Sequence, residues 1–330
     1  MTLQEHDSII RTGAAIGAIA PRRQIAVAGK DHATYLHGLL TNDIQGLAPG
    51  TGCYAAWLTP QGRMLTDMHL LESGAMILLD VPAETVDATL ARLDQFVFTE
   101  DVRLESLADT LTGLWVHGPR AAEAIGRVVS EAPLSEWRQY QHATFHISGE
   151  AVSIARIDQI GVPGYCLFVA RAQEASLLTA LESAGAVVVL PEAVEAARIE
   201  AGYPVFGIDM TDDTIPLEAG IEDRAISMTK GCYVGQEVII RVLHRGHGRV
   251  VRKLVGLRID GALPLRGARL VVNDREVGSI TSAARSPRLG AIALGYVHRD
   301  FVNAGSQISV ETPDGVATAV VTEPLTPSAP

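Results

Sequence analysis

Eight consecutive residues in the C-terminal half of the chain combine a cation, a thiol, a phenol, an amide and a carboxylate around two glycines. They are Lys230, Gly231, Cys232, Tyr233, Val234, Gly235, Gln236 and Glu237. Core packing alone rarely requires this mixture, and the pattern predicts a loop that enters a helix, with the cysteine near its positive end. A thiolate at Cys232 would be stabilised there by the helix dipole and by Lys230. The alternative is a glycine-hinged turn whose cysteine packs as a small hydrophobic residue.

A second candidate residue is Glu200, which follows a helical pattern over residues 192–197. Gly202 and Pro204 are expected to end that helix, so Glu200 lies at the end where the helix dipole disfavours a carboxylate. A residue placed against local electrostatics invites a functional explanation. A carboxylate can accept two parallel N–H bonds from a flat heteroaromatic ring. The alternative is a salt bridge with Arg198 or another arginine.

A basic cluster follows the eight-residue stretch. It consists of Arg241, His244, Arg245, His247, Arg249, Arg252 and Lys253. Such a cluster could meet the carboxylates of a ligand or an acidic partner, and the alternative is a solvated loop between domains. The two histidines lack cysteines or carboxylates at ligand spacing, so we expect no metal site.

Composition excludes several classes of protein. The 330 residues carry a net charge of −11, which argues against a general binder of nucleic acid or of anionic membranes. No apolar run is long enough to span a membrane, and residues 1–11 lack the apolar core of a signal peptide. The cysteines, at positions 53, 166 and 232, are scattered and odd in number, which argues against a disulfide framework. We therefore expect a reduced, cytoplasmic protein. We also expect a monomer, although the residues do not identify the oligomeric state.

The chain contains an internal repeat. A strand pattern ending in Gly29 precedes a helical pattern, and the same order recurs at Gly118, 118 − 29 = 89 residues later. The strand patterns that begin at Gly74 and Gly164 lead into helices expected at 83–93 and 173–184, at an offset of 164 − 74 = 90. We interpret residues of about 24–105 and 111–205 as two ferredoxin-like α+β pseudo-repeats. The alternative is chance similarity between short strand–helix pieces.

The sequence pattern changes near Val250. Short alternating strands separated by turn signals are expected at 253–259, 269–272, 276–281, 292–297, 307–310 and 316–322. This pattern predicts a small β-barrel or sandwich over residues 249–330, with a frayed tail at 324–330. Residues 1–248 then form the other domain, in which 206–248 are the segment that carries the eight-residue stretch.

The eight-residue stretch resembles the K-G-C-Y-x-G-Q-E signature of the YgfZ proteins, which are folate-binding relatives of the glycine-cleavage T-protein that act in maintaining iron–sulfur enzymes. The R-x-E-x-G segment at 198–202 resembles the T-protein superfamily, and the resemblance implies that Glu200 holds the pterin of folate. The T-N-D motif at 41–43 and Asp67 resemble further superfamily motifs, which implies that Asn42 and Asp67 belong to the cofactor site. Tyr233 could stack on the pterin, and Arg241 of the basic cluster could meet the glutamate tail of folate. Thr41 and Asp43 could equally be capping residues, and Tyr233 could simply pack.

The resemblance also implies a fold. Two ferredoxin-like units and a C-terminal β-barrel would form a three-domain ring of the GcvT type, with folate in its central opening. Two departures concern the site. Where T-proteins carry two adjacent aspartates, this chain has Thr66 before Asp67, and a threonine cannot act as a general base or stabilise a cation as a carboxylate can. Near the tryptophans that flank the pocket of some YgfZ proteins, this chain has Arg22 or Arg23, and Val194.

Three functions are consistent with these residues. The leading hypothesis is a tetrahydrofolate-binding factor for assembly or repair of iron–sulfur enzymes, in which Cys232 is the reactive thiol and Lys230 activates it. Its partners would be folate and iron–sulfur client enzymes or assembly proteins. The second is a folate-dependent aminomethyltransferase, and the third is a non-enzymatic folate-sensing interaction protein. The residues leave open whether the protein turns over a substrate.

Overall fold

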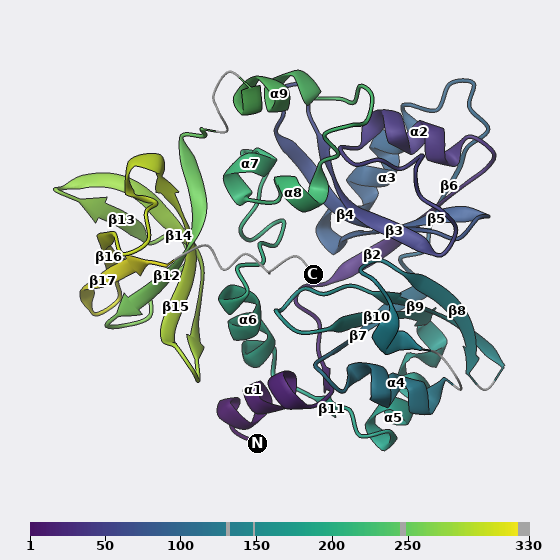
Figure 1. Cartoon of the computed structure of the whole chain (residues 1–330), viewed down its shortest axis with the longest axis horizontal. Coiled ribbons are helices and arrows are strands. Elements are labelled where there is room, and N and C mark those ends of the chain that lie inside the picture. Colours follow the sequence, from purple (N-terminus) through teal and green to yellow (C-terminus); the bar gives the residue numbers. More distant parts are fainter. Residues whose placement is uncertain (130–132, 148, 245–248, 323–330) are drawn as a thin grey trace.

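Two α+β units and a β-barrel make up the structure, a computed structural model that describes residues 1–129, 133–147, 149–244 and 249–322. The two units lie one above the other on the right of Figure 1, and the barrel lies on the left. Helix α6 (Pro191–Glu200) stands between the barrel and the second unit. This is the α+β, GcvT-like arrangement that the sequence predicted.

The first unit is a five-stranded antiparallel sheet in the order β3-β4-β5-β2-β6, with two helices on one face. Its strands are β2 (Arg22–Ala28), β3 (Thr51–Leu58), β4 (Met64–Glu72), β5 (Met76–Pro82) and β6 (Arg103–Ser106), and its helices are α2 (His32–Leu39) and α3 (Val86–Asp94). The turn between β3 and β4 contains Gly62 at φ 76°, a conformation that a glycine adopts at little cost.

The second unit is a six-stranded sheet in the order β11-β1-β7-β10-β9-β8. Its strands are β1 (Ala15–Ile16), β7 (Leu111–His117), β8 (His142–Ile147), β9 (Glu150–Arg156), β10 (Gly164–Ala170) and β11 (Val187–Val188), and its helices are α4 (Ala121–Val128) and α5 (Glu174–Ser183). The N-terminal segment contributes β1, which follows helix α1 (Leu3–Thr12) and pairs with both β7 and β11. The sequence pattern gave no sign of this strand.

The two sheets face each other with their helix-free surfaces. Alternate residues of a strand point to opposite faces, and in both units one set packs under the helices, as Met68 and Leu70 do in β4 and Val116 does in β7. The other set meets between the sheets. That contact is an apolar cluster formed by Leu71, Leu78, Trp115, Ala155, Ile157, Cys166 and Phe168.

The segment after α6 crosses the centre of the molecule towards the barrel and carries three short helices, α7 (Pro216–Ala219), α8 (Glu222–Ala225) and α9 (Gln236–His244). Its apolar residues pack against β3 and β4, where they form a core with Tyr54, Leu58 and Met64. The segment therefore ties residues far apart in the chain to the first sheet.

The third part is a closed six-stranded barrel in the order β12-β15-β14-β13-β16-β17. Its strands are β12 (Arg252–Asp260), β13 (Arg269–Val272), β14 (Arg275–Ser286), β15 (Gly290–His298), β16 (Gln307–Thr312) and β17 (Gly315–Val321). The predicted barrel is thus confirmed. The predicted boundary between residues 248 and 249 borders positions 245–248, which lie outside the described residues, as do Arg245, His247 and the tail at 324–330.

A buried ion pair helps to hold the barrel against α6. Arg198 and Asp209 are both fully buried, and the Arg198 Nη1 lies 2.7 Å from the Asp209 Oδ2. Arg198 also donates to the Tyr203 carbonyl and to Ser282 of β14 at 2.8 Å each, and Thr281 donates to Asp209 at 2.6 Å. Because a buried charge without a partner is costly, these contacts fix the barrel against α6.

Among the described residues, no helix combines the length and the apolar composition that crossing a membrane requires.

Candidate functional site

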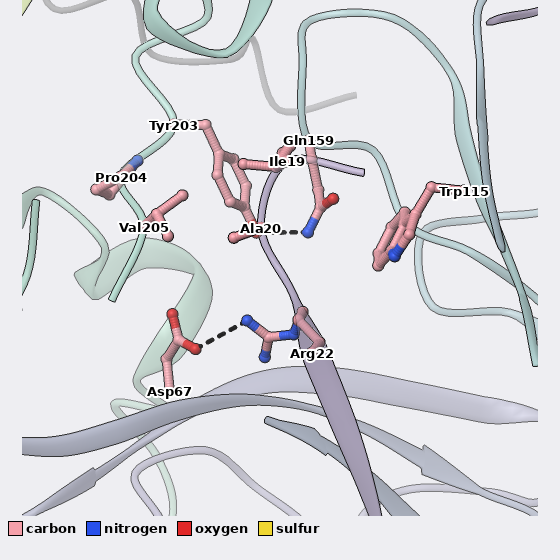
Figure 2. Close-up of a pocket in the computed structure, with 9 residues that line it drawn as sticks. All are labelled: Ile19, Ala20, Arg22, Asp67, Trp115, Gln159, Tyr203, Pro204 and Val205. Atoms are coloured by element: carbon pink, nitrogen blue, oxygen red, sulfur yellow. Dashed lines mark hydrogen bonds and ion pairs between the residues drawn. The ribbon is translucent and has the colours of Figure 1, made fainter. Parts of the chain in front are cut away.

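A small polar cavity lies where the two units and the segment after α6 meet. Its lining residues are Ile19, Ala20, Arg22, Asp67, Trp115, Gln159, Tyr203, Pro204 and Val205, and Figure 2 shows them from close by. The cavity holds about 20 Å³, the room of roughly one water molecule. It combines two aromatic side chains with a few convergent polar groups, which is the composition of a ligand site.

Arg22 is the central cation of this cavity. Its Nε lies 2.6 Å from the Asp80 Oδ2, and its Nη1 lies 3.1 Å from the Asp67 Oδ1. Burial lowers the pKa of Arg22, but Asp80 and Asp67 outweigh burial and raise the pKa overall. Arg22 therefore stays charged and holds two carboxylates that β4 and β5 bring to the inner face of the sheet.

The two carboxylates differ in what else they bind. Asp67 accepts a hydrogen bond from the Tyr54 hydroxyl at 2.7 Å and faces the cavity. Asp80 accepts one from the Gln24 amide at 2.8 Å. Burial raises the pKa of Asp80, although Arg22 and Gln24 act in the opposite direction. Asp67 is thus the carboxylate that a ligand in the cavity would meet.

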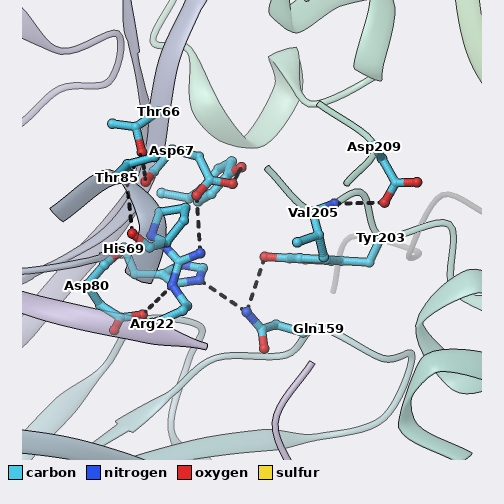
Figure 3. A network of polar contacts seen from close by, with 12 residues as sticks. Arg22, Thr66, Asp67, His69, Asp80, Thr85, Gln159, Tyr203, Val205 and Asp209 are labelled. Carbon is cyan, nitrogen blue, oxygen red and sulfur yellow. Dashed lines mark hydrogen bonds and ion pairs between the residues drawn. The ribbon is translucent and has the colours of Figure 1, made fainter. Parts of the chain in front are cut away.

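His69 lies on the same face of β4, two residues after Asp67. Its Nδ1 is 3.2 Å from the Tyr140 hydroxyl. Its Nε2 is 3.1 Å from the Gln159 Nε2, and Figure 3 shows this second contact. Burial, helped by the nearby positive charges of Arg22 and Arg224, lowers the pKa of His69 well below its ordinary value. His69 is therefore neutral at physiological pH.

A second arginine stands beside the cavity. The Arg224 guanidinium lies 4.1 Å from the ring centre of Tyr203 and 4.9 Å from that of Tyr54. Such cation–π contacts hold the guanidinium in place. Neighbouring tyrosines and Asp67 keep the pKa of Arg224 raised although burial opposes this. The site therefore contains two permanent cations.

Thr66 precedes Asp67 but contributes no charge. Its side chain is buried, and its hydroxyl lies 2.9 Å from the Thr85 hydroxyl. At this point of β4 the cavity thus has one carboxylate, as the sequence indicated.

Glu200 lies elsewhere. It is the last residue of α6, as predicted, and its carboxylate contacts Arg11 Nη2 at 2.8 Å, together with Arg288 and the hydroxyl of Ser286. These partners come from α1 and from the end of β14 and the turn after it. The arrangement is the ion-pair alternative, with Arg11 and Arg288 as the arginines, and Glu200 is not among the residues that line the central cavity.

The eight-residue stretch forms a loop against the end of α2. The Lys230 Nζ donates to the carbonyls of His37, Leu40 and Asn42 at 2.5, 2.6 and 3.1 Å. Cations are favourable at the C-terminus of a helix, so Lys230 caps α2. Burial lowers the pKa of Lys230 to about 8, and Asp43 acts in the opposite direction. Its ammonium also lies 5.1 Å from the ring centre of Tyr233.

The thiol of this loop faces outward. Cys232 is exposed, and α9 begins four residues later at Gln236. Gly235 has φ 85°, and a Cβ there would lie 2.5 Å from the Thr59 carbonyl oxygen, so the loop requires glycine. Gln236 donates to the Gly231 carbonyl at 3.5 Å. Tyr233 is buried, which raises its pKa to about 12, whereas Glu237 is exposed.

The predicted site residues therefore divide among separate places. Asp67 lines the cavity, Glu200 joins α1, α6 and β14, and Arg241 is exposed on α9. Asn42, which follows α2, donates to the carbonyls of Tyr54 on β3 and Arg224 on α8, at 2.8 and 3.1 Å, and so links β3 to α8 beside Lys230. Among the described residues, no group of three or more His, Cys, Asp or Glu is arranged to hold a metal.

Sequence reasoning missed His69, Gln159, Tyr203 and Arg224. One signal was available for His69. It is separated from Asp67 by one residue within a strand whose other residues are largely apolar, and residues two apart share a face. A polar pair at that spacing indicates a buried polar surface.

Two family models match the chain. Residues 1–230 match the GCVT N-terminal domain, and residues 252–326 match the glycine cleavage T-protein C-terminal barrel domain. The chain belongs to the glycine cleavage T-protein (GcvT) family.

Relatives in this family span nearly the whole chain. An aminomethyltransferase of Bacillus subtilis (strain 168) is 28% identical over 317 residues, covering 93% of this chain and 86% of that protein. An aminomethyltransferase of Thermosynechococcus vestitus is 30% identical over 322 residues, covering 97% and 86%. The glycine cleavage system aminomethyltransferase T of Bartonella henselae has the same fold, with a TM-score of 0.86 at 24% identity over 98% of this chain and 90% of that one.

Proposed function

We propose that this GcvT-family chain binds tetrahydrofolate or a related folate in the central cavity and acts as a folate-dependent aminomethyltransferase. The observation that carries the proposal is Asp67, a buried carboxylate that faces the cavity and pairs with Arg22. The names of the relatives agree with this activity.

The lining suits the pterin part of folate. Trp115 and Tyr203 offer aromatic faces to a flat ring, and Arg22, Asp67 and Gln159 offer hydrogen-bonding groups. When bound, tetrahydrofolate would supply the nitrogen that takes up a one-carbon unit.

The residues of the chain would then do the following. The negative charge of Asp67 stabilises positive charge that develops on a nitrogen of the ligand. Arg22 and the Tyr54 hydroxyl hold that carboxylate in place. Trp115 and the tyrosines exclude water, which strengthens the electrostatic interaction. Because Thr66 carries no charge, this stabilisation of positive charge falls to the carboxylate of Asp67.

The test is aminomethyl transfer from a lipoyl carrier protein to tetrahydrofolate, followed by release of ammonia. Asp67→Asn should lower kcat by at least about 100-fold while the protein stays folded. Glu311→Gln, which alters an exposed ion pair on the barrel, is the matched control and should leave kcat unchanged. Wild-type protein that binds folate but transfers no aminomethyl group would contradict this activity and leave folate binding intact.

A second function is favoured by the exposed thiol. In this alternative the chain is a YgfZ-type, folate-loaded factor that maintains iron–sulfur enzymes, with Cys232 as the reacting group. Its support is the exposure of Cys232 on a loop that Lys230 anchors, together with the single carboxylate in the cavity. Because the Lys230 ammonium is bound by three carbonyls, its role here would be to hold the loop.

Complementation tests the second function. A bacterial strain without its own YgfZ-type protein would express wild type, Cys232→Ser or Cys53→Ser, and a [4Fe–4S]-dependent enzyme would be assayed. Loss of rescue with Cys232→Ser alone supports the thiol role. Equal rescue by all three contradicts it and favours a folate-sensing interaction protein.

A further inference from the structure

We propose that Gln159 presents its amide oxygen to the ligand of the central cavity, and that His69 fixes this orientation. The inference rests on the proposed folate binding, and it assigns one contact in that site. The ligand group would be an N–H donor on a flat heteroaromatic ring, such as the pterin of tetrahydrofolate.

The position of Gln159 makes it a contact residue. It follows β9 in the second unit, is only 5% exposed and lines the cavity. In Figure 2 its amide lies between Tyr203 and Trp115. With so little of the residue exposed, the partners open to the two ends of its amide are the neighbouring side chains and whatever fills the cavity.

Only the nitrogen end has partners. The Gln159 Nε2 lies 3.1 Å from the His69 Nε2 and 3.5 Å from the Tyr203 hydroxyl (Figure 3). An amide nitrogen carries two hydrogens, so these two contacts use both of them. No contact within the described part of the chain uses the Gln159 oxygen, which leaves it for a donor on the ligand.

His69 sets which end of the amide points where. A neutral imidazole has one donor and one acceptor nitrogen. In this arrangement Nε2 accepts from Gln159, so the proton lies on Nδ1 and is donated to the Tyr140 oxygen, 3.2 Å away. Turning the amide over would place its oxygen at Nε2 and would require the other tautomer. The tautomer of His69 and the orientation of Gln159 are therefore one coupled choice.

Burial, helped by neighbouring positive charges, keeps His69 neutral. The groups that face it are Arg22 of β2, Arg224 of α8, Tyr54 of β3, Tyr140 and the Trp115 ring of β7. Both arginines disfavour a second proton on the imidazole, and no carboxylate contacts it among the described residues. The acceptor nitrogen is thus preserved as the pH falls into the mildly acidic range.

The contacts of Glu200 leave the acceptor role in the cavity to another group. Its carboxylate, the expected acceptor for a pterin, already binds Arg11, Arg288 and Ser286. Gln159 offers an acceptor inside the cavity without adding a charge next to Asp67. Recognition by a neutral amide also predicts that this contact does not titrate.

The first test examines the orientation without any ligand. Nitrogen-15 NMR of ligand-free protein, with His69 assigned by comparison with His69→Gln, reports which ring nitrogen carries the proton. A proton on Nδ1 supports the proposal. A proton on Nε2 overturns it, because the amide oxygen would then face His69.

The second test measures binding of 5-formyltetrahydrofolate by titration calorimetry. Gln159→Leu should weaken binding about tenfold, and His69→Leu should do the same by freeing the amide to rotate. His69→Gln, which restores an acceptor, should recover most of the loss. Gln45→Leu, an exposed glutamine on the first unit, should bind as wild type does.

The two tests separate the ways of failing. Wild-type binding by Gln159→Leu, when wild type itself binds, overturns the inference and leaves the proposed function standing. Absence of binding by wild type overturns the proposed function and with it the ligand contact, while the NMR result still decides the orientation. If Gln159→Leu does not fold, Gln159→Met replaces it, since it keeps the shape and removes the acceptor.

Discussion

The two α+β units share one architecture but present opposite chemistry on the faces that meet. The inner face of the first sheet carries Arg22, Gln24, Asp67, His69 and Asp80, all linked by hydrogen bonds or ion pairs except that His69 bonds across to Gln159 and Tyr140. The inner face of the second sheet carries mainly apolar groups. They include Trp115, Ala155, Cys166 and Phe168.

The contrast shows that two units of similar architecture can have different roles in one site. Burying three charges on one sheet has a desolvation cost that apolar residues would avoid. The second sheet supplies the low-dielectric wall against which those charges act strongly. One unit thus provides the reactive groups and the other provides their environment.

The largest expected effect comes from removing the central cation. Arg22→Met leaves Asp67 and Asp80 buried without their partner, and we expect it to lower the free energy of unfolding by about 3–5 kcal/mol at pH 7. Urea unfolding measures it. Because the unpaired carboxylates can take up protons, the loss should be smaller at pH 5 than at pH 8. A loss that does not change with pH would show that the carboxylates are not the cause.

The next effect comes from a histidine of the second unit. Burial lowers the pKa of His117, whose ring stacks on Trp115, from 6.5 to about 4. The contribution of neutral His117 to the free energy of unfolding is fully present above pH 6.5 and is lost as the pH falls towards 4. Over this range the unfolded chain binds a proton that the folded protein does not. At about 1.4 kcal/mol per pH unit this amounts to about 3 kcal/mol.

Urea unfolding from pH 7 to pH 4 checks this contribution. His117→Phe should make the decline of the free energy of unfolding with falling pH shallower by the contribution of one proton. The contributions of the other histidines whose pKa burial lowers, His37, His69 and His142, should remain. His146→Phe, an exposed control on β8, should not alter the slope. An unchanged slope in His117→Phe would mean that His117 gains a proton in the folded protein.

The rate of reaction with a thiol reagent should distinguish the cysteines of the two units from Cys232 in the loop. Each unit holds one shielded cysteine. Burial raises the pKa of Cys53 to about 12 and the pKa of Cys166 well above its ordinary value. Cys232 is exposed, so at pH 8 it should react with a disulfide reagent at least about tenfold faster than either. Cys232→Ser should abolish the fast phase, and a fast phase that persists would contradict the assignment.

The smallest effect is expected for an arginine of the second unit. Arg156 pairs with Asp158 at 3.2 Å, and their side chains are 20% and 31% exposed. Arg156 also donates to the Trp137 carbonyl at 2.5 Å. Because solvent screens the ion pair, Arg156→Met should mainly remove that hydrogen bond and should cost about 1 kcal/mol in urea unfolding. A cost similar to that of Arg22→Met would remove the contrast between the units.

Local patterns predicted much of the fold. The helix expected at 83–93 corresponds to α3, the recurrence at 89 and 90 residues indicated the second unit, and turn signals separated the strands of the barrel. Each of these features depends on neighbours within a few residues. Strand β1 was missed because two residues show no periodicity.

The site was predictable only in part, because its contacts join distant residues. Asp67 was identified through a resemblance, and Arg22 as a departure from it. The partners of Glu200, which are 189 and 88 residues away, and the bond between His69 and Gln159, 90 residues apart, leave no trace in local sequence. The same applies to Lys230, whose carbonyl partners lie about 190 positions earlier.

The buried ion pair of Arg198 and Asp209 affects how the protein unfolds. Arg198 binds Glu195 of its own helix, the carbonyl of Tyr203 at the cavity and Ser282 of the barrel. Pulling the barrel away would leave Arg198 with a vacant donor and would loosen the residue that shapes the cavity. The barrel and the cavity should therefore melt in one cooperative transition, and a chain shortened at residue 249 would lose the cavity along with the barrel.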